Sequence, residues 1–227
     1  MAAESRELLR RVSLFASLND EALAGLIGHL RRRSFRHGTM IFHKDQTGDA
    51  LYIVESGRVR LFVPAEGGEE LTVDIAGPGE VFGELALLDG RPRSASAEAV
   101  DDTVAHTIDR ETLRQVLTTT PGLAAALIEL LSARLRHVTD YAESLAFMDV
   151  HARVARALLE LGDRYGVKAN GIEIDLDLTQ AELATMVGAT RERVNRALAV
   201  FRSQGLVELR GRKIVIRDAE RLRQRIY

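Results

Sequence analysis

Apolar residues recur at different intervals in successive parts of this sequence. Residues 8–30 have helical spacing, with Asn19 or Asp20 as a potential N-cap. From about residue 33 to residue 108 the spacing changes to short runs rich in β-forming residues, such as "ALYIVES", "RVRLFV", "ELTVDIA" and "TVAHTID", with glycine-containing turns between them. Several short strands at this spacing predict an antiparallel sandwich or roll.

A long helix is predicted over residues 121–147, because Pro121 suits a first helical turn and the apolar positions then recur in steps of four and three. These positions are Ala124, Ile128, Leu131, Leu135, Val138, Ala142 and Leu145. The spacing favours a seam between two helices, and therefore a homodimer, over an amphipathic helix that lies on its own domain. At ~1.5 Å per residue the helix is about 40 Å long, which is enough to link two domains.

Beyond the long helix, "VHARVARALLELGDRY" predicts another helix, "VKANG" a polar turn and "IEIDLDL" a strand. Thr179 and Thr190 are N-caps of two short helices joined by "VGA", and "LVELRGRKIVIRD" is a hairpin that turns at Arg210-Gly211. Two such helices followed by a hairpin predict a helix-turn-helix with a wing. We therefore expect an α+β protein with an N-terminal antiparallel, jelly-roll-like β-roll (1–120), a long dimerisation helix (121–147) and a C-terminal winged helix-turn-helix (148–227).

The charge is unevenly distributed along the chain. Residues 178–227 contain eleven Lys/Arg and five Asp/Glu, which gives +6, whereas the whole chain carries −2, so the remaining residues carry −8. A basic segment attached to an acidic body indicates a polyanion as the partner of that segment alone. The alternative is an ordinary solvated surface.

The second helix of the predicted helix-turn-helix has side chains that can read double-stranded DNA. Arg191, Glu192 and Arg196 lie in its first two turns, where a recognition helix meets base edges. Arginine can bond guanine O6 and N7 together, and glutamate can accept from cytosine N4. The other candidate DNA-binding residues are Thr179 and Thr190 at the helix starts, and Arg212 and Lys213, which would meet phosphates at the hairpin tip. The alternative is a solvated helix and an exposed turn.

The segment "FGELALLDGRPRSASA" places one acid and one arginine among apolar and small residues. A short helical turn begun by Gly83, Glu84 and Leu85 would aim free backbone N–H groups at a phosphate, and the glycine permits close approach. Arg93 can bond a phosphate bidentately, Ser94 adds a hydroxyl donor, and Glu84 can accept from a ribose hydroxyl. These residues fit a cyclic nucleotide. The alternative is a buried Glu84–Arg93 pair that neutralises itself.

Three motifs together resemble the cyclic AMP receptor protein (Crp–Fnr) family of bacterial transcription regulators: "FGELALLDGRPRSASA", "LAFMDVHARVARALLEL" and "LTQAELATMVGATRERVNRAL". The resemblance runs nearly end to end and implies that Gly83, Glu84, Arg93 and Ser94 hold cyclic AMP, an allosteric effector rather than a catalytic cofactor. It implies that Val138 and Thr139 stand where polar residues of the family's dimer helix reach the adenine, one of them from the opposite subunit. Thr139 fits that role, whereas Val138 departs from the usual hydroxyl or amide. A TGTGA-like half-site and RNA polymerase as a partner are also implied.

Other features exclude several classes of protein. The chain has no cysteine, its six histidines show no ligand spacing, and no catalytic constellation is readable, so we expect no metal site and no enzyme. It has no run of 18 apolar residues and no signal peptide, so we expect a cytoplasmic protein without a membrane partner. Two alternatives remain. One is a regulator that binds DNA without a nucleotide or with a different effector. The other is a nucleotide-sensing module of a signalling enzyme. That alternative needs a catalytic domain, and residues 149–227 are too short and too basic to form one.

Overall fold

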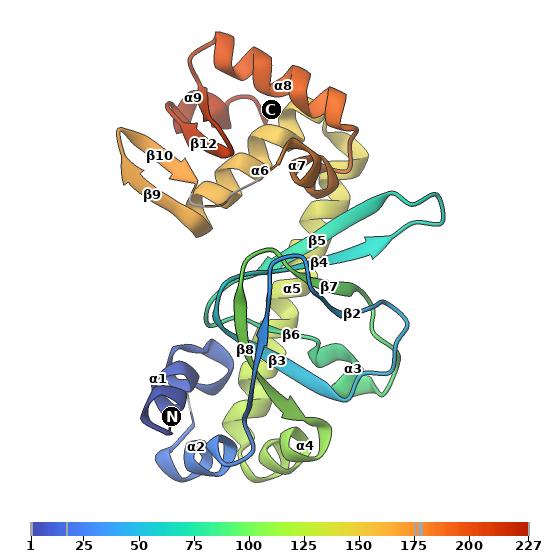
Figure 1. The fold of residues 1–227 in the computed structure, drawn as a ribbon, viewed down its shortest axis with the longest axis vertical. Helices are drawn as coiled ribbons and strands as arrows, with labels where there is room; N and C mark the ends of the chain where they lie inside the picture. Colours follow the sequence, from blue (N-terminus) through green and yellow to red (C-terminus); the bar gives the residue numbers. More distant parts are fainter. Residues whose placement is uncertain (1, 17, 175, 177–178, 227) are drawn as a thin grey trace. The chain divides into compact units, whose positions relative to one another are not determined.

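The computed structural model describes residues 2–16, 18–174, 176 and 179–226. Its contacts divide the chain into two compact units (Figure 1). The first comprises the residues up to 68 together with 73–137, and the second comprises 69–72 together with the residues from 138 onward. The domain limits expected from the sequence stay a prediction.

The first unit is built from two four-stranded sheets and several short helices. Its strands are β1 (Arg31–Phe35), β2 (Met40–Phe42), β3 (Ala50–Ser56), β4 (Val59–Pro64), β5 (Glu70–Ala76), β6 (Val81–Phe82), β7 (Ser96–Ala99) and β8 (Thr103–Asp109). Of β5, residues 70–72 are grouped with the second unit. Its helices are α1 (Ala2–Arg11), the 3₁₀ turn η1 (Ser13–Phe15), α2 (Asp20–Ile27), α3 (Glu84–Asp89) and α4 (Arg110–Thr119). The sheets have the orders β1-β8-β3-β6 and β2-β7-β4-β5, and the pairs with a described register are antiparallel, which confirms the predicted roll.

Two apolar clusters hold the roll together. One lies between the sheets and includes Phe42, Val54 and Phe82. The other joins the first sheet to α1, α2, α4 and the start of the long helix, with Phe15 and Leu123 fully buried. Figure 1 shows α1, α2 and α4 together at one end of the roll. The segment that carries Glu84 and Arg93 is therefore supported by packed strands on a rigid frame.

Strand β1 was not predicted, because its sequence "RRRSF" has no apolar alternation. It stands at the edge of the sheet formed by the described residues and pairs with β8, from Arg31↔Thr107 to Phe35↔Thr103. Four of its five residues are exposed, and an edge strand tolerates such charge because one side has no neighbouring strand. Helix α4, capped by the Asp109 carboxylate, also escaped the sequence prediction.

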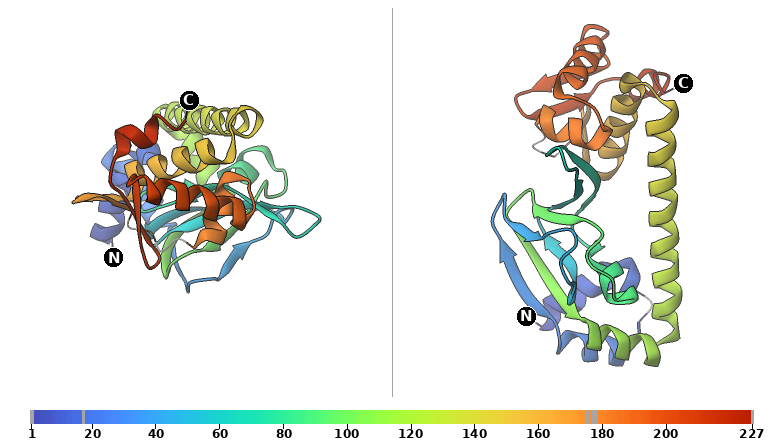
Figure 2. Two further views of the ribbon diagram at one scale, coloured as in Figure 1. Left: turned by 90° about the horizontal axis from the view of Figure 1, so that it is seen from above. Right: turned by 90° about the vertical axis from the view of Figure 1, so that its right-hand side faces the viewer.

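Helix α5 (Pro121–Phe147) has the predicted bounds and is uninterrupted in Figure 2. Leu123 and Leu127 are buried in the core of the first unit, so one face of the helix does lie on its own domain. Another face remains exposed: Ile128 is 65%, Leu135 67% and Val138 54% accessible. The interpretation as an amphipathic helix that lies on its own domain therefore holds for the buried face, whereas the seam between two helices stays a prediction for the exposed face.

The second unit contains a four-stranded sheet and the helices that pack on it. Its elements are α6 (Val150–Tyr165), β9 (Gly166–Ala169), β10 (Gly171–Ile174), α7 (Gln180–Val187), α8 (Arg191–Ser203), β11 (Val207–Arg210), β12 (Lys213–Ile216) and α9 (Ala219–Arg223). The sheet order is β11-β12-β10-β9. Leu158, Leu183, Val194, Leu198 and Phe201 are buried at its core. The unit is the predicted helix-turn-helix with a wing.

The polar turn predicted at "VKANG" is shorter than expected, because Gly166–Ala169 forms strand β9 and β10 begins at Gly171. Strand β9 pairs with β10, for example Val167↔Glu173, and the chain reverses at Gly171, which has φ +111°. An exposed edge strand of this kind has too few apolar residues for its periodicity to be recognised. The predicted strand "IEIDLDL" forms β10 up to Ile174, while residues 175 and 177–178 lie outside the described residues.

No single helix in the described part of the chain is long and apolar enough to span a membrane, although the bent pair Arg110–Thr119 and Gly122–Phe147 meets that criterion jointly. Within the same residues there is no group of three or more His, Cys, Asp or Glu side chains that could hold a metal ion.

Candidate functional site

Arg93 is a buried cation in the first unit. Its side chain is 3% exposed, and it donates to the carbonyl oxygens of Gly83 at 2.5 Å and Ala50 at 2.7 Å. The guanidinium lies 4.2 Å from the ring centroid of Phe42. Burial lowers the pKa of Arg93, but an arginine remains charged at neutral pH. Among the described residues no carboxylate lies within ion-pair distance of it, and its Nε has no hydrogen-bond partner.

Two glycines make room for this guanidinium. Gly83 adopts φ +78°, and a Cβ there would lie 2.6 Å from Arg93 Nη1. A Cβ at Gly48 would lie 2.4 Å from the Ala86 Cβ and 3.0 Å from Arg93 Cζ. Gly83 is the N-cap of α3 and provides no side-chain cap, so the first N–H groups of this turn have no such partner. The backbone at Gly83 therefore lies close to the Arg93 guanidinium, while its predicted approach to a phosphate stays a prediction.

Glu84 is buried to 1% exposure, and its partner is Arg134 rather than Arg93. Arg134 Nη1 donates to Glu84 Oε1, and Arg134 Nη2 donates to the Val81 carbonyl oxygen. The alternative of a self-neutralising Glu84–Arg93 pair is therefore wrong. The second oxygen of the acid, Oε2, is buried without a hydrogen-bond partner. Arg93 Nε and Glu84 Oε2 are thus two unsatisfied polar atoms, which in a native fold indicate a missing partner such as water or a ligand.

The other candidate ligand-binding residues are accessible. Leu85 is 42% exposed in the first turn of α3, and Ser94 is exposed directly after the buried Arg93. Thr139 is exposed on α5 and belongs to the second unit. The structure therefore brings Gly83, Glu84 and Arg93 together. The expected contact of Thr139 with a pocket of the opposite subunit stays a prediction.

The helix-turn-helix begins with a capping box. The Thr179 hydroxyl accepts from the Glu182 backbone N–H at 3.1 Å, and the Glu182 carboxylate accepts from the Thr179 backbone N–H at 2.6 Å. The hydroxyl also donates to that carboxylate at 2.6 Å, so it is engaged within the protein. Gly188 ends α7 in the left-handed conformation with φ +58°. Thr190 then caps α8 through the Arg193 N–H at 3.4 Å.

Helix α8 presents a polar face to solvent. Arg191, Glu192 and Arg196 are all exposed, while Val194 and Leu198 are buried against the rest of the unit. This orientation leaves the predicted base-reading side chains available to a duplex. In the wing, Arg212 is exposed, and Lys213 Nζ lies 3.1 Å from Glu173 Oε1.

Comparisons with known proteins identify the domain families of the two regions that contain these residues. The cyclic nucleotide-binding domain family matches residues 32–120, and the Crp-like helix-turn-helix domain family matches residues 152–225. The chain is 38% identical to a Mycobacterium tuberculosis protein named "CRP-like cAMP-activated global transcriptional regulator" over 96% of this chain and 98% of that protein. The chain belongs to the Crp–Fnr family.

Solved structures show the same Crp–Fnr architecture. FixK2 from Bradyrhizobium japonicum has a TM-score of 0.78 at 28% identity and covers 86% of this chain and 96% of its own. The c-di-GMP-responsive global regulator CLP from Xanthomonas campestris has a TM-score of 0.76 at 28% identity and covers 87% of this chain and 99% of its own. This Crp–Fnr protein is therefore a DNA-binding transcription regulator with a cyclic nucleotide-binding domain, and it is not an enzyme.

Two residues of this Crp–Fnr protein were missed by sequence reasoning. Arg134 follows Leu123 and Leu127 by eleven and seven residues, so it lies on the same buried face of α5. An arginine on such a face indicates a buried acid as its partner, which here is Glu84. Glu173 faces the wing from β10, a strand that is distant in sequence, and only the sheet order places it there.

Proposed function

We propose that this Crp–Fnr protein is a cyclic AMP-responsive regulator that binds pseudo-palindromic operators as a homodimer in the cytoplasm. The observation that carries the proposal is the buried Arg93 guanidinium, which has no carboxylate within ion-pair distance in the described part of the chain. An unpaired buried charge is costly, and an anion that enters the site offsets that cost. The monoanionic phosphodiester of a cyclic nucleotide has the charge and the paired oxygens that a guanidinium binds.

Glu84 supplies the second recognition element. Its Oε2 atom is buried and has no partner, so it can accept a hydrogen bond from a ribose 2′-hydroxyl. Ser94, exposed beside Arg93, and the uncapped first turn of α3 add donors for the phosphate. Cyclic AMP as the effector is further supported by the name of the M. tuberculosis relative, which describes it as cAMP-activated.

A Crp–Fnr regulator with a different effector, or with none, is the second candidate. Val138, at a position where the family has a polar adenine contact, and the c-di-GMP response stated for CLP favour this alternative. Calorimetric titration with cyclic AMP, cyclic GMP and c-di-GMP separates the two. A measurable heat of binding with cyclic AMP supports the proposal. A heat of binding with c-di-GMP alone, or no heat of binding with any of the three nucleotides, rejects it.

The exposed apolar face of α5, with Ile128, Leu135 and Val138, supports a homodimer whose two α5 helices pack together. Cyclic AMP would then favour one of two placements of the DNA-binding units. In that placement the two α8 helices would stand about 34 Å apart, one turn of DNA. We expect Arg191 and Arg196 to read guanines and Glu192 a cytosine in TGTGA-like half-sites, with RNA polymerase as a further partner.

Two substitutions test the assignment of the two sites. Arg93→Ala should reduce cyclic AMP affinity at least about a hundredfold, because it removes charge-assisted hydrogen bonds, while weak non-specific DNA binding remains. Arg91→Ala replaces an exposed arginine two residues away, so it is the matched control and should bind cyclic AMP normally. A full cyclic AMP response in Arg93→Ala would show that the nucleotide site is misassigned.

Arg191→Ala tests the DNA-binding site. It should weaken operator binding by about 1–3 kcal/mol with unchanged cyclic AMP affinity.

A further inference from the structure

The outer face of the winged sheet carries a connected set of opposite charges. Strand order and register place Glu208 on β11 and Glu173 on β10 in one row, since both pair with Val215 on β12. Arg210 and Lys213 pair with each other and lie two residues along the same face. The opposite face holds the buried Ile214 and Ile216. The polar face is therefore a surface on which two carboxylates lie among the cations of the wing.

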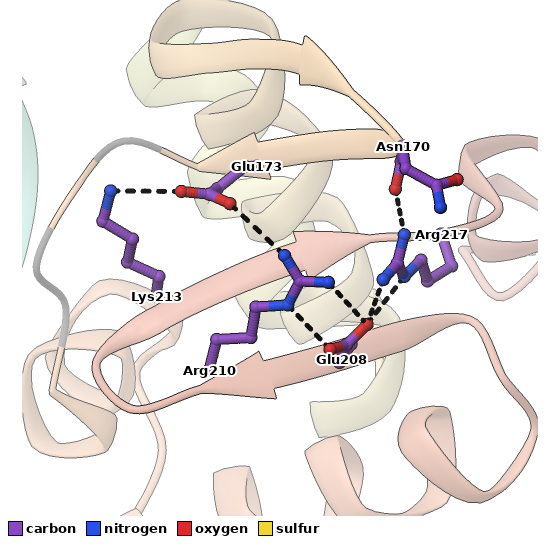
Figure 3. Close-up of polar contacts among 6 residues, drawn as sticks. All are labelled: Asn170, Glu173, Glu208, Arg210, Lys213 and Arg217. Carbon is purple, nitrogen blue, oxygen red and sulfur yellow. Dashed lines mark hydrogen bonds and ion pairs between the residues drawn. The ribbon is translucent and has the colours of Figure 1, made fainter.

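Figure 3 shows how the two carboxylates share these cations. Glu173 lies 3.1 Å from Lys213 Nζ and 3.8 Å from Arg210 Nη1. Arg210 Nε donates to Glu208 at 2.7 Å, so Arg210 connects the two acids. Arg217 donates to the other Glu208 oxygen, with Nε at 2.8 Å, and to the carbonyl oxygen of Asn170. The hydrogen bonds from Arg210 and Arg217 lower the pKa of Glu208, so it is ionised at neutral pH.

This arrangement changes what the wing offers to DNA. A phosphate can bind Lys213, Arg210 or Arg217 only in competition with a carboxylate that already neutralises the cation. Phosphate contacts supply essentially all of non-specific DNA binding, whereas base contacts supply specificity. Acids that occupy the cations of the wing therefore weaken binding to any duplex, while the base contacts expected from α8 are untouched.

We infer that Glu173 and Glu208 restrain phosphate binding by the wing and so raise the ratio of operator binding to non-specific binding. This inference rests on the proposed operator recognition for its biological meaning, but its central measurement uses a duplex of scrambled sequence and needs no operator. The acids are specificity-determining residues that act on the backbone contacts rather than on the bases.

The test compares Glu173→Gln with Glu220→Gln in anisotropy titrations over a series of salt concentrations. Glu220, on α9, is 82% exposed and pairs with Arg223 at 2.6 Å, so its substitution changes the net charge equally without touching the wing. Glu173→Gln should bind the scrambled duplex about two- to fivefold more tightly than Glu220→Gln, as expected from releasing surface ion pairs. Its salt slope should be steeper by about 0.9 for each additional phosphate that the wing binds.

The double variant Glu173→Gln/Lys213→Gln shows which cation is responsible. Removal of Lys213 as well restores the wild-type net charge, and it should return most of the extra affinity and slope to the wild-type level. Equal affinity and slope for Glu173→Gln and Glu220→Gln on the scrambled duplex would overturn the inference, even if the wild type reads its operator. A wild-type protein that fails to distinguish operator from scrambled duplex would instead reject the proposed function, and that outcome is read from a separate titration.

Discussion

Gly83 in the candidate nucleotide site is constrained in two ways at once. Its φ of +78° disfavours any side chain, and a Cβ would lie 2.6 Å from the Arg93 guanidinium. Gly83→Ala should therefore cost about 1–2 kcal/mol in the free energy of unfolding and also displace Arg93, so that cyclic AMP affinity falls more than about tenfold. Urea denaturation and calorimetry measure the two effects.

Gly38→Ala separates backbone strain from loss of the pocket. Gly38 has φ +75°, but a Cβ there would meet nothing within 4 Å. It should lose similar stability and keep its nucleotide affinity. Equal cyclic AMP affinity in the two variants would show that Gly83 does not position Arg93.

The same residues show what sequence can predict at this scale. Local chemistry identified Gly83, Glu84 and Arg93 as a group, and the structure does bring them together. It could not identify the partner of Glu84, because Arg134 is fifty residues away and only the packing of α5 on the roll brings the two side chains into contact. A contact formed by tertiary packing leaves no local pattern in the sequence.

At the scale of elements, apolar periodicity was informative where an element has one buried face. It located β3, β5 and β8 at their observed bounds, and it located α5 as well. It failed for β1 and β9, which are edge strands with mostly exposed residues, and for the short helices α4 and α9. Burial of a face creates the alternation that sequence analysis detects, so the exposed strand β1 escaped it. Helix α4 does bury Leu113, but α4 and α9 have only ten and five residues, which is too short for a helical period to stand out.

The contact of α5 with α7 in the second unit gives a pH-dependent prediction. The Tyr141 hydroxyl donates to the Met186 carbonyl oxygen at 3.0 Å, and burial raises the pKa of Tyr141 to about 12. In the unfolded chain tyrosine ionises near pH 10, so the stability that the neutral hydroxyl provides is complete below about pH 10 and is lost as the pH rises toward 12. The free energy of unfolding should therefore fall more steeply over this range in the wild type than in Tyr141→Phe. Parallel pH profiles in urea denaturation would contradict this assignment.

For the whole molecule, the decisive question is whether α5 has a second helix as its partner. Ile128 and Leu135 are each about two-thirds exposed and lie one heptad apart, on a face distinct from Leu123 and Leu127. Burying such side chains stabilises an interface by up to about 1.5–3 kcal/mol each, and a buried lysine charge would oppose it. Ile128→Lys should therefore weaken the dimer at least about tenfold in sedimentation experiments.

Ala133→Lys is the matched control, because Ala133 is exposed on α5 and lies outside the apolar seam. It adds the same charge to the same helix and should remain as dimeric as the wild type.

Loss of the dimer in Ile128→Lys should also abolish tight binding to an operator with two half-sites, since each α8 helix would then bind only one half-site. Binding to a single half-site should persist, because α8 and its supporting core lie entirely in the second unit. A dimer of unchanged affinity in Ile128→Lys would show that the seam is not the interface. Two-site operator binding would then require a different contact between protomers.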